Sequence, residues 1–169
     1  MPEMPEVQGL VDFLAGRAAG LEITKVTVAS IAVLKTYDPP IDALTGTTVV
    51  GASRRGKFID LATSSQGADA GIHLVFHLAK AGWLRWYDQL PATVIRPGKT
   101  PIALRVGFDD GAGFDLTEAG TKKSLACYVV RDPADVPGIA RLGPDPLDPT
   151  FTRDQFAQLH HGRAEARPH

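Results

Sequence analysis

The sequence of 169 residues contains a single cysteine, Cys127, and no apolar run long enough to cross a bilayer. One cysteine excludes an internal disulfide and any zinc site built from four cysteines of this chain. Because Cys127 lies in an apolar run, we expect a buried structural thiol. No basic segment followed by an apolar one stands near the start, so we expect a cytosolic protein without a cleaved signal.

Basic residues are also too few to mark the whole chain as a nucleic-acid binder, since the net charge is −1. Residues 51–100, however, carry seven Lys or Arg against three Asp or Glu. The basic members of this segment are Arg54, Arg55, Lys57, Lys80, Arg85, Arg96 and Lys99. They would form a phosphate-facing stripe if the fold gathered them. Scattered, solvated charges are the alternative, and composition does not separate the two.

Hydrophobic periodicity predicts one helix followed by strands. Apolar residues recur at helical spacing from Pro5 to Ala19, and Gly20 closes the segment. From Leu21 onward the period changes to two. Turn residues then separate strands that we place at 22–30, 47–54, 57–63, 71–78, 82–88, 101–109, 112–117 and 124–131. The predicted fold class is mainly β: an antiparallel β-sandwich of about eight strands preceded by one N-terminal amphipathic helix.

We expect this sandwich domain to occupy residues 1–131. Residues 132–151 contain several prolines and are predicted to form a linker over the surface. Residues 152–169 are either the start of a helical domain or a polar tail. A chain of this size is long enough for one globular domain with a core of its own.

The first six residues, Met-Pro-Glu-Met-Pro-Glu, carry a motif with chemical meaning. Removal of Met1 makes Pro2 a terminal secondary amine, which is unprotonated at neutral pH far more often than a lysine. Attack of this amine on a sugar carbon gives an iminium that promotes elimination, and Glu3 would move the protons. The alternative is structural: Pro5 begins a helix, with Glu3 and Glu6 at the positive end of its dipole.

Four stretches of the sequence together resemble one family. They are Met1–Val7, Arg54-Arg55-Gly56-Lys57-Phe58, His77-Leu78-Ala79-Lys80-Ala81-Gly82-Trp83-Leu84-Arg85 and Leu142-Gly143-Pro144-Asp145-Pro146-Leu147. In order and spacing they are similar to the formamidopyrimidine-DNA glycosylase and endonuclease VIII (Fpg/Nei) family of base-excision repair enzymes, over about residues 1 to 160. We expect the family's helix-two-turns-helix element and zinc finger to lie outside this chain. No metal or cofactor is therefore expected in it.

The resemblance implies a DNA repair glycosylase with apurinic/apyrimidinic lyase activity, which excises oxidised bases through a Schiff base. By position, Pro2 is the nucleophile, Glu3 the acid/base partner, Lys57 a cation that contacts phosphate and assists elimination, and Glu6 a supporting carboxylate. The DNA-binding residues implied in the same way are Arg54, Arg55, Lys80, Lys122 and Lys123. The implied partner is damaged or abasic DNA, with no membrane and no protein partner inferred, and the implied location is the nucleoid of a bacterial-type cytosol.

The sequence departs from that family at two places. Lys80 stands where similar proteins carry an apolar residue that enters the gap left by the extruded base. Glu118–Ser124 stands where the family tends to carry Asp-Pro-Arg-Arg-Phe-Gly, so the positive charge is kept and the aromatic side chain is lost. Reading of the opposite base is therefore not implied.

Two further interpretations of the sequence compete with that of an enzyme of this family. One is a non-catalytic, truncated remnant that folds as a sandwich and binds DNA weakly. The other is a small tautomerase that uses an N-terminal proline as base, which is disfavoured because a helix follows Pro2. His73 and His77 would share a metal only on a helix; on the predicted strand they lie about 13 Å apart, too far for one ion.

Overall fold

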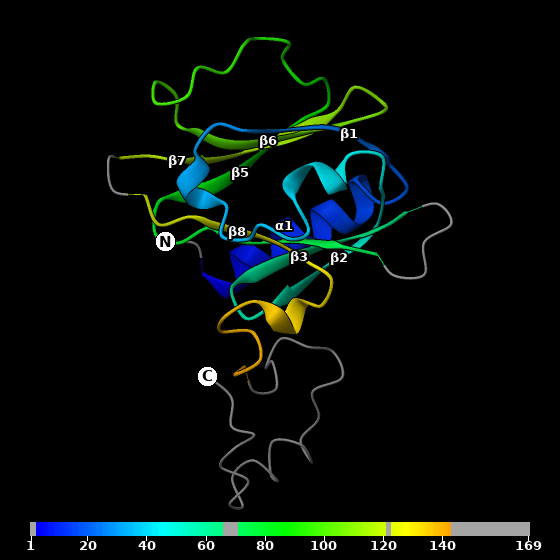
Figure 1. Cartoon of the computed structure of the whole chain (residues 1–169), viewed down its shortest axis with the longest axis vertical. Coiled ribbons are helices and arrows are strands. Elements are labelled where there is room, and N and C mark those ends of the chain that lie inside the picture. Colours follow the sequence, from blue (N-terminus) through cyan, green and yellow to red (C-terminus); the bar gives the residue numbers. More distant parts are fainter. Residues whose placement is uncertain (1–2, 66–70, 121–122, 143–169) are drawn as a thin grey trace, which may run out of the picture.

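The structure, a computed structural model, describes residues 3–65, 71–120 and 123–142. Within these ranges the chain forms one α-helix and two four-stranded antiparallel sheets packed face to face (Figure 1). The helix α1 spans Met4–Arg17. The strands are β1 Ile23–Val28, β2 Thr48–Arg55, β3 Phe58–Ser64, β4 His73–His77, β5 Gly82–Tyr87, β6 Ile102–Phe108, β7 Gly113–Glu118 and β8 Ala126–Val130. The predicted fold class is confirmed, and each expected strand is present with slightly shifted ends.

The two sheets have the strand orders β2-β3-β4-β8 and β1-β6-β7-β5. Alternation along the strands sends one set of side chains inward: Ile59 and Leu61 of β3, for example, meet Leu104 and Leu116 from the opposite sheet in one core. Cys127 is fully buried in this core, and burial raises the pKa of its thiol to about 12. The structural role predicted for this cysteine agrees with that position.

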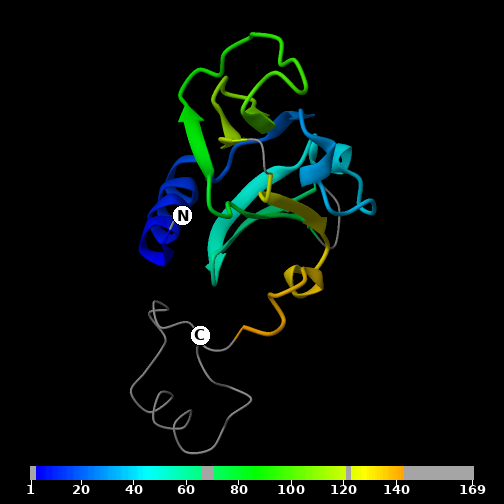
Figure 2. The ribbon, with the colours of Figure 1, turned by 90° about the vertical axis from the view of Figure 1, so that its left-hand side faces the viewer.

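Helix α1 closes one side of the sandwich, between β2 and β5, the edge strands of the two sheets (Figure 2). Its residues Val7, Val11 and Leu14, spaced by a helical turn, are buried in the core. At its end Arg17 lies over the ring of Trp86 in β5 at 5.1 Å. Burial of Val7, just after the first turn, and the contact of Arg17 at the last turn hold the helix against the sandwich, and with it the N-cap residue Glu3. No helix within the described ranges is long and apolar enough to cross a membrane.

The outer faces of the two sheets are covered differently. On the β1-β6-β7-β5 sheet, buried Arg105 donates two hydrogen bonds to Asp115, at 2.7 and 2.8 Å, and a third to the carbonyl of Pro91 at 3.1 Å. The long connection between β5 and β6 therefore lies over this face (Figure 1).

On the β2-β3-β4-β8 sheet, the segment that follows β8 forms the cover. We call residues 133–142 the cap segment; it begins with the 3₁₀ helix η3, Pro133–Asp135, and is yellow to orange in Figure 1. Its Val136 and Ile139 are 1% and 8% exposed and pack in a cluster with Phe58 and Val75 of the sheet.

The first part of the predicted linker thus packs on the sandwich. The reason is that its apolar residues recur three apart, at Val136, Ile139 and Leu142, and face an apolar sheet surface. The division at residues 131 and 151 stays a prediction, since residues 143–169 lie outside the described ranges.

Candidate functional site

Three connections between strands meet at one end of the sandwich. Phe58 pairs with His77, and His77 with Ala126, so the β2–β3 turn, the end of β4 and the start of β8 are neighbours. Gly82 pairs with Glu118, which brings the β4–β5 connection beside the end of β7. The backbone N–H of Ala119 donates to the carbonyl of Ala81 at 3.4 Å. This hydrogen bond links the β7–β8 connection to the β4–β5 connection.

Glu3 and Lys57, two of the residues predicted to be catalytic, come together at this end. Glu3 is the N-cap residue of α1, and Lys57 follows Gly56 in the two-residue β2–β3 turn. Gly56 has a φ of +61°, a left-handed conformation that favours glycine. The Lys57 ammonium and the Glu3 carboxylate form an ion pair with Nζ and Oε2 at 3.9 Å. Pro2 lies outside the described residues.

Glu6, predicted to support the site, holds the first turn of α1. The backbone N–H of Glu3 donates to Glu6 Oε1 at 2.9 Å, which is one half of a capping box. Val7 N–H donates to the carbonyl of Glu3 at 3.0 Å. The carboxylate of Glu6 thereby fixes the backbone from which the Glu3 side chain projects, and its part in catalysis stays a prediction.

His77, which opens one of the stretches that resemble the family but was not predicted as a site residue, also lies at this end of the sandwich, paired with Phe58. Its ring meets Phe58 edge-on, with ring centroids 5.0 Å apart. Its Nδ1 accepts the backbone N–H of Ala79 at 2.9 Å, so the neutral imidazole carries its proton on Nε2. Burial, and then the nearby Lys57 ammonium, lower the pKa of His77 from 6.5. His77 therefore presents a neutral N–H donor near Lys57 at neutral pH.

Arg54 and Arg55, predicted to bind DNA, make contacts within the protein. Arg54 donates from Nε to Gln8 Oε1 and from one terminal nitrogen to the carbonyl of Gly56, both at 2.8 Å. It thus connects α1 to the β2–β3 turn. Arg55 donates from Nε to Asp60 at 3.0 Å. Whether either arginine also contacts DNA stays a prediction.

The carboxylate of Asp60, only 1% exposed, holds His73 as well as Arg55: its Oδ1 lies 2.7 Å from His73 Nδ1. His73 and His77 stand at opposite ends of β4, as the predicted strand required. In the described part of the chain, no group of three or more His, Cys, Asp or Glu side chains gathers as metal ligands would.

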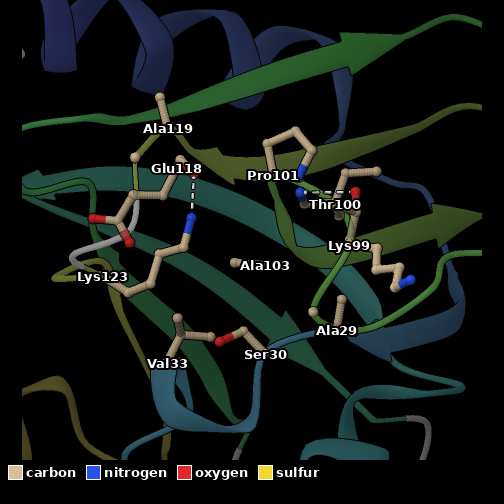
Figure 3. A pocket seen from close by; sticks show the side chains of 13 residues that line it. Ala29, Ser30, Val33, Lys99, Thr100, Pro101, Ala103, Glu118, Ala119 and Lys123 are labelled. Carbon is tan, nitrogen blue, oxygen red and sulfur yellow. Dashed lines mark hydrogen bonds between the residues drawn. The ribbon is translucent and has the colours of Figure 1, made fainter.

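Lys80 and Lys123 are exposed at the same end of the sandwich, on the β4–β5 and β7–β8 connections, and Lys122 lies outside the described residues. Figure 3 shows the Lys123 ammonium turned toward the main chain of Glu118, whose carbonyl accepts it at 2.7 Å. The buried Glu118 carboxylate accepts the backbone N–H groups of Ser124 and Leu125 at 2.8 and 2.9 Å. Glu118, which sequence reasoning did not single out, therefore organises this connection.

A pocket of about 540 Å³ lies beside that connection (Figure 3). Glu118 and Lys123 bound it on one side, and Lys99 and Thr100 bound it on the other. Other basic residues of segment 51–100 lie elsewhere: Arg85 is on β5 with its guanidinium 4.9 Å from the centre of the Tyr87 ring.

Comparison with known proteins assigns the fold and the family. The model of the formamidopyrimidine-DNA glycosylase N-terminal domain matches residues 1–123. The formamidopyrimidine-DNA glycosylase of Mycolicibacterium vanbaalenii is 32% identical over 173 residues, which cover 94% of this chain and 56% of the relative. That of Desulforamulus reducens is 31% identical over 160 residues, covering 91% and 53%. The chain thus spans about half the length of the curated relatives it matches.

Solved structures of Lactococcus lactis Fpg share the fold of this chain. A Lactococcus lactis Fpg mutant in complex with a Fapy-dG-containing DNA has a TM-score of 0.69 and 25% identity, covering 86% of this chain and 50% of its own. A complex of L. lactis Fpg with an abasic-site DNA has a TM-score of 0.71 and 23% identity, covering 92% and 55%, and supports the fold alone. By the match of its first 123 residues, this chain belongs to the formamidopyrimidine-DNA glycosylase family, in the part that forms the N-terminal domain.

Proposed function

We propose that this chain carries the chemistry of a DNA repair glycosylase with apurinic/apyrimidinic lyase activity, acting through the amine of Pro2. The observation that supports it most is the ion pair between Glu3 and Lys57, Nζ to Oε2 at 3.9 Å. Glu3 directly follows Pro2 in the sequence, so this pair joins the start of the chain to the β2–β3 turn. A nucleophile, an acid/base group and a cation are thereby supplied by three residues.

The reaction proceeds in two stages. Pro2 nitrogen forms a bond to C1′ of the damaged nucleotide, the glycosidic bond breaks, and the departing base takes a proton. Opening of the sugar ring then gives an iminium with a permanent positive charge. Loss of a C2′ proton sends electrons toward this cation, and the C3′–O bond breaks with release of the phosphate. In this proposal Glu3 carries the protons in both stages.

The same end of the sandwich is the proposed DNA surface. Lys57, Lys80 and Lys123 supply positive charge there, and the Nε2–H of His77 supplies a neutral donor. Phosphate oxygens are the groups that such donors bind in nucleic acids, without regard to sequence. The proposed partner is damaged or abasic duplex DNA, with the target nucleotide turned out of the stack.

Borohydride trapping on an abasic-site duplex tests this proposal, because only an iminium is reduced to a covalent protein–DNA adduct. We expect an adduct with protein shown by mass spectrometry to begin at Pro2. Pro2→Gly, which leaves a primary amine, should give far less adduct, and protein that retains Met1 should give none. Full trapping with Met1 retained would refute the role of Pro2. Binding without any adduct would favour the non-catalytic remnant.

The presence of a lysine at position 80 predicts that the protein acts faster on abasic sites than on intact damaged bases. Extruding a base costs a few kcal/mol, and an exposed lysine cannot fill the gap as an apolar side chain would. Single-turnover cleavage should therefore be faster on an abasic-site duplex than on an 8-oxoguanine duplex at the same salt concentration. Lys80→Met should narrow the difference, whereas equal rates in the parent protein would show that no wedge is needed.

A further inference from the structure

The β2–β3 turn, which carries Lys57, is packed from behind by the cap segment. A Cβ atom built on Gly56 would lie 3.1 Å from both Cδ1 and Cδ2 of Leu142, and the third nearest atom is Leu142 Cγ at 3.7 Å. The backbone of the residue before Lys57 therefore rests directly on this leucine side chain. A separation of 3.1 Å is tighter than ordinary van der Waals contact, so Leu142 would have to shift by a few tenths of an ångström to admit a side chain on Gly56, whose φ of +61° already favours glycine.

The residue after Lys57 is held by the same segment. Gly138 has a φ of +96°, and a Cβ built on it would lie 3.6 Å from Cε2 of the Phe58 ring. The cap residues Val136 and Ile139 are in the cluster that includes Phe58. Both chain neighbours of Lys57, Gly56 and Phe58, thus contact the cap segment, while the Lys57 ammonium extends to Glu3.

We propose that the cap segment positions Lys57, and that Leu142 is the positioning residue through its contact with Gly56. The inference rests on the proposed function for what Lys57 does to DNA. Its physical basis is that the contacts at Gly56 and Phe58 give the turn an apolar support, in addition to the hydrogen bond from Arg54 to the Gly56 carbonyl and the pairing of Arg55 with Phe58. Misplacement of a reacting group by about 1 Å can cost about 10²-fold in rate, so a support behind the turn matters for catalysis.

Leu142 differs from Val136 and Ile139 of the cap segment in its contact with the β2–β3 turn. Val136 and Ile139 are buried and cover the sheet, whereas Leu142 is only partly buried and makes the contact with the turn. Val136→Ala is therefore a matched control: it shortens an apolar side chain in the same cluster without removing the contact on Gly56. A purely structural role for Leu142 would make the two variants behave alike.

The first measurement is an NMR titration of His77 in the full 169-residue chain, which needs no DNA. The Lys57 ammonium lowers the pKa of His77, after the larger effect of burial. Lys57→Ala should raise this pKa, and Leu142→Ala should raise it by part of the same amount. In the Lys57→Ala background, Leu142→Ala should then add nothing, and Val136→Ala should leave the parent value unchanged.

Several results would overturn the inference. One is an unchanged pKa of His77 in Leu142→Ala, and another is an equal rise with and without Lys57, which would mean loss of burial. An unchanged pKa in Lys57→Ala would do so too, because Lys57 would not be held near His77. Leu142→Met, which keeps an apolar side chain of similar volume, should restore the parent value and covers the case in which Leu142→Ala folds poorly.

The second measurement uses DNA and separates this inference from the proposed function. Single-turnover strand cleavage of the abasic-site duplex should slow in Leu142→Ala, recover in Leu142→Met and stay near the parent rate in Val136→Ala. If Lys57→Ala leaves the cleavage rate unchanged, the proposed role of Lys57 fails whatever the titration shows. If Lys57→Ala abolishes cleavage while Leu142→Ala has no effect, only the positioning inference fails.

Discussion

The β2–β3 turn and the β7–β8 connection both present a lysine at the same end of the sandwich, yet the two lysines are used differently. Gly56 rests on the apolar side chain of Leu142 and its carbonyl accepts from Arg54, while the Lys57 ammonium reaches another element, at Glu3. The β7–β8 connection is held by hydrogen bonds to the carboxylate of Glu118, and the Lys123 ammonium folds back on the Glu118 carbonyl.

The difference separates two uses of a positive charge. The Lys57 ammonium interacts with a carboxylate of another element. A lysine that donates to its own connection instead contributes to the shape of that connection. Lys57 is therefore the better placed for chemistry, and Lys123 for ordering the surface beside the pocket.

The largest expected effect on catalysis is that of replacing Lys57 by alanine, compared with the same replacement at Lys123. Lys57→Ala should reduce the single-turnover rate of strand cleavage on abasic-site DNA by about 10²- to 10³-fold, because removal of one group that stabilises developing charge has an effect of this size. Lys123→Ala should reduce it by no more than a few-fold. Equal losses in the two variants would remove the distinction drawn between the two connections.

Glu118 should dominate the stability of its connection. Glu118→Ala removes the acceptor of two backbone N–H groups and should lower the free energy of unfolding by about 2–3 kcal/mol, measured by urea denaturation. Glu118→Gln keeps one carbonyl oxygen for these donors and should cost less. If both variants unfold at the parent midpoint, the carboxylate does not anchor the connection.

The pH dependence of stability should carry a contribution from His77, which faces Lys57, the Phe58 ring and the Ala79 N–H. Its pKa in the folded protein is lowered from 6.5, so on acidification the unfolded chain binds the proton first. The contribution of His77 to the free energy of unfolding is therefore fully present above about pH 6.5. It is lost as the pH falls toward the lowered pKa that His77 has in the folded protein. Urea unfolding between pH 5 and 8 should show this slope, reduced in His77→Gln; an unaltered slope would exclude His77 as its source.

The smallest effect concerns the salt dependence of DNA binding. Lys80→Ala should lower the slope of log K against log salt by about one unit, since one phosphate contact is lost. Arg55→Ala should lower it by less, because the guanidinium is already held by Asp60, with Nε to Oδ2 at 3.0 Å. A full unit lost in Arg55→Ala would place that arginine on the DNA surface.

Strands and helix were accessible from the sequence because each sends regularly spaced apolar side chains into the shared core, as Ile59 and Leu61 show in β3. The Glu3–Lys57 pair could be anticipated only through resemblance, since nothing local joins positions so far apart. The packing of the cap segment was missed because its prolines indicated a linker, although the spacing of Val136, Ile139 and Leu142 carried the signal.

His77 and Glu118 were not predicted in their observed roles, for a different reason. His77 was weighed as a metal ligand, and its position near Lys57 depends on the pairing of β3 with β4. From its local sequence, Glu118 is expected to be an exposed polar residue at the end of a strand. It is 2% exposed in the structure because the β7–β8 connection folds back over it, which depends on contacts distant from its local sequence.

The cap segment also has a consequence for any shortened form of this protein. A fragment that stops at residue 131, where the sandwich was expected to end, would retain the eight strands β1 to β8 and still expose Phe58, Val75 and Val130 to water. Exposed apolar patches of this kind favour self-association. A fragment that extends through Leu142 keeps the patch covered, so the two lengths should differ in aggregation although they contain the same sheets.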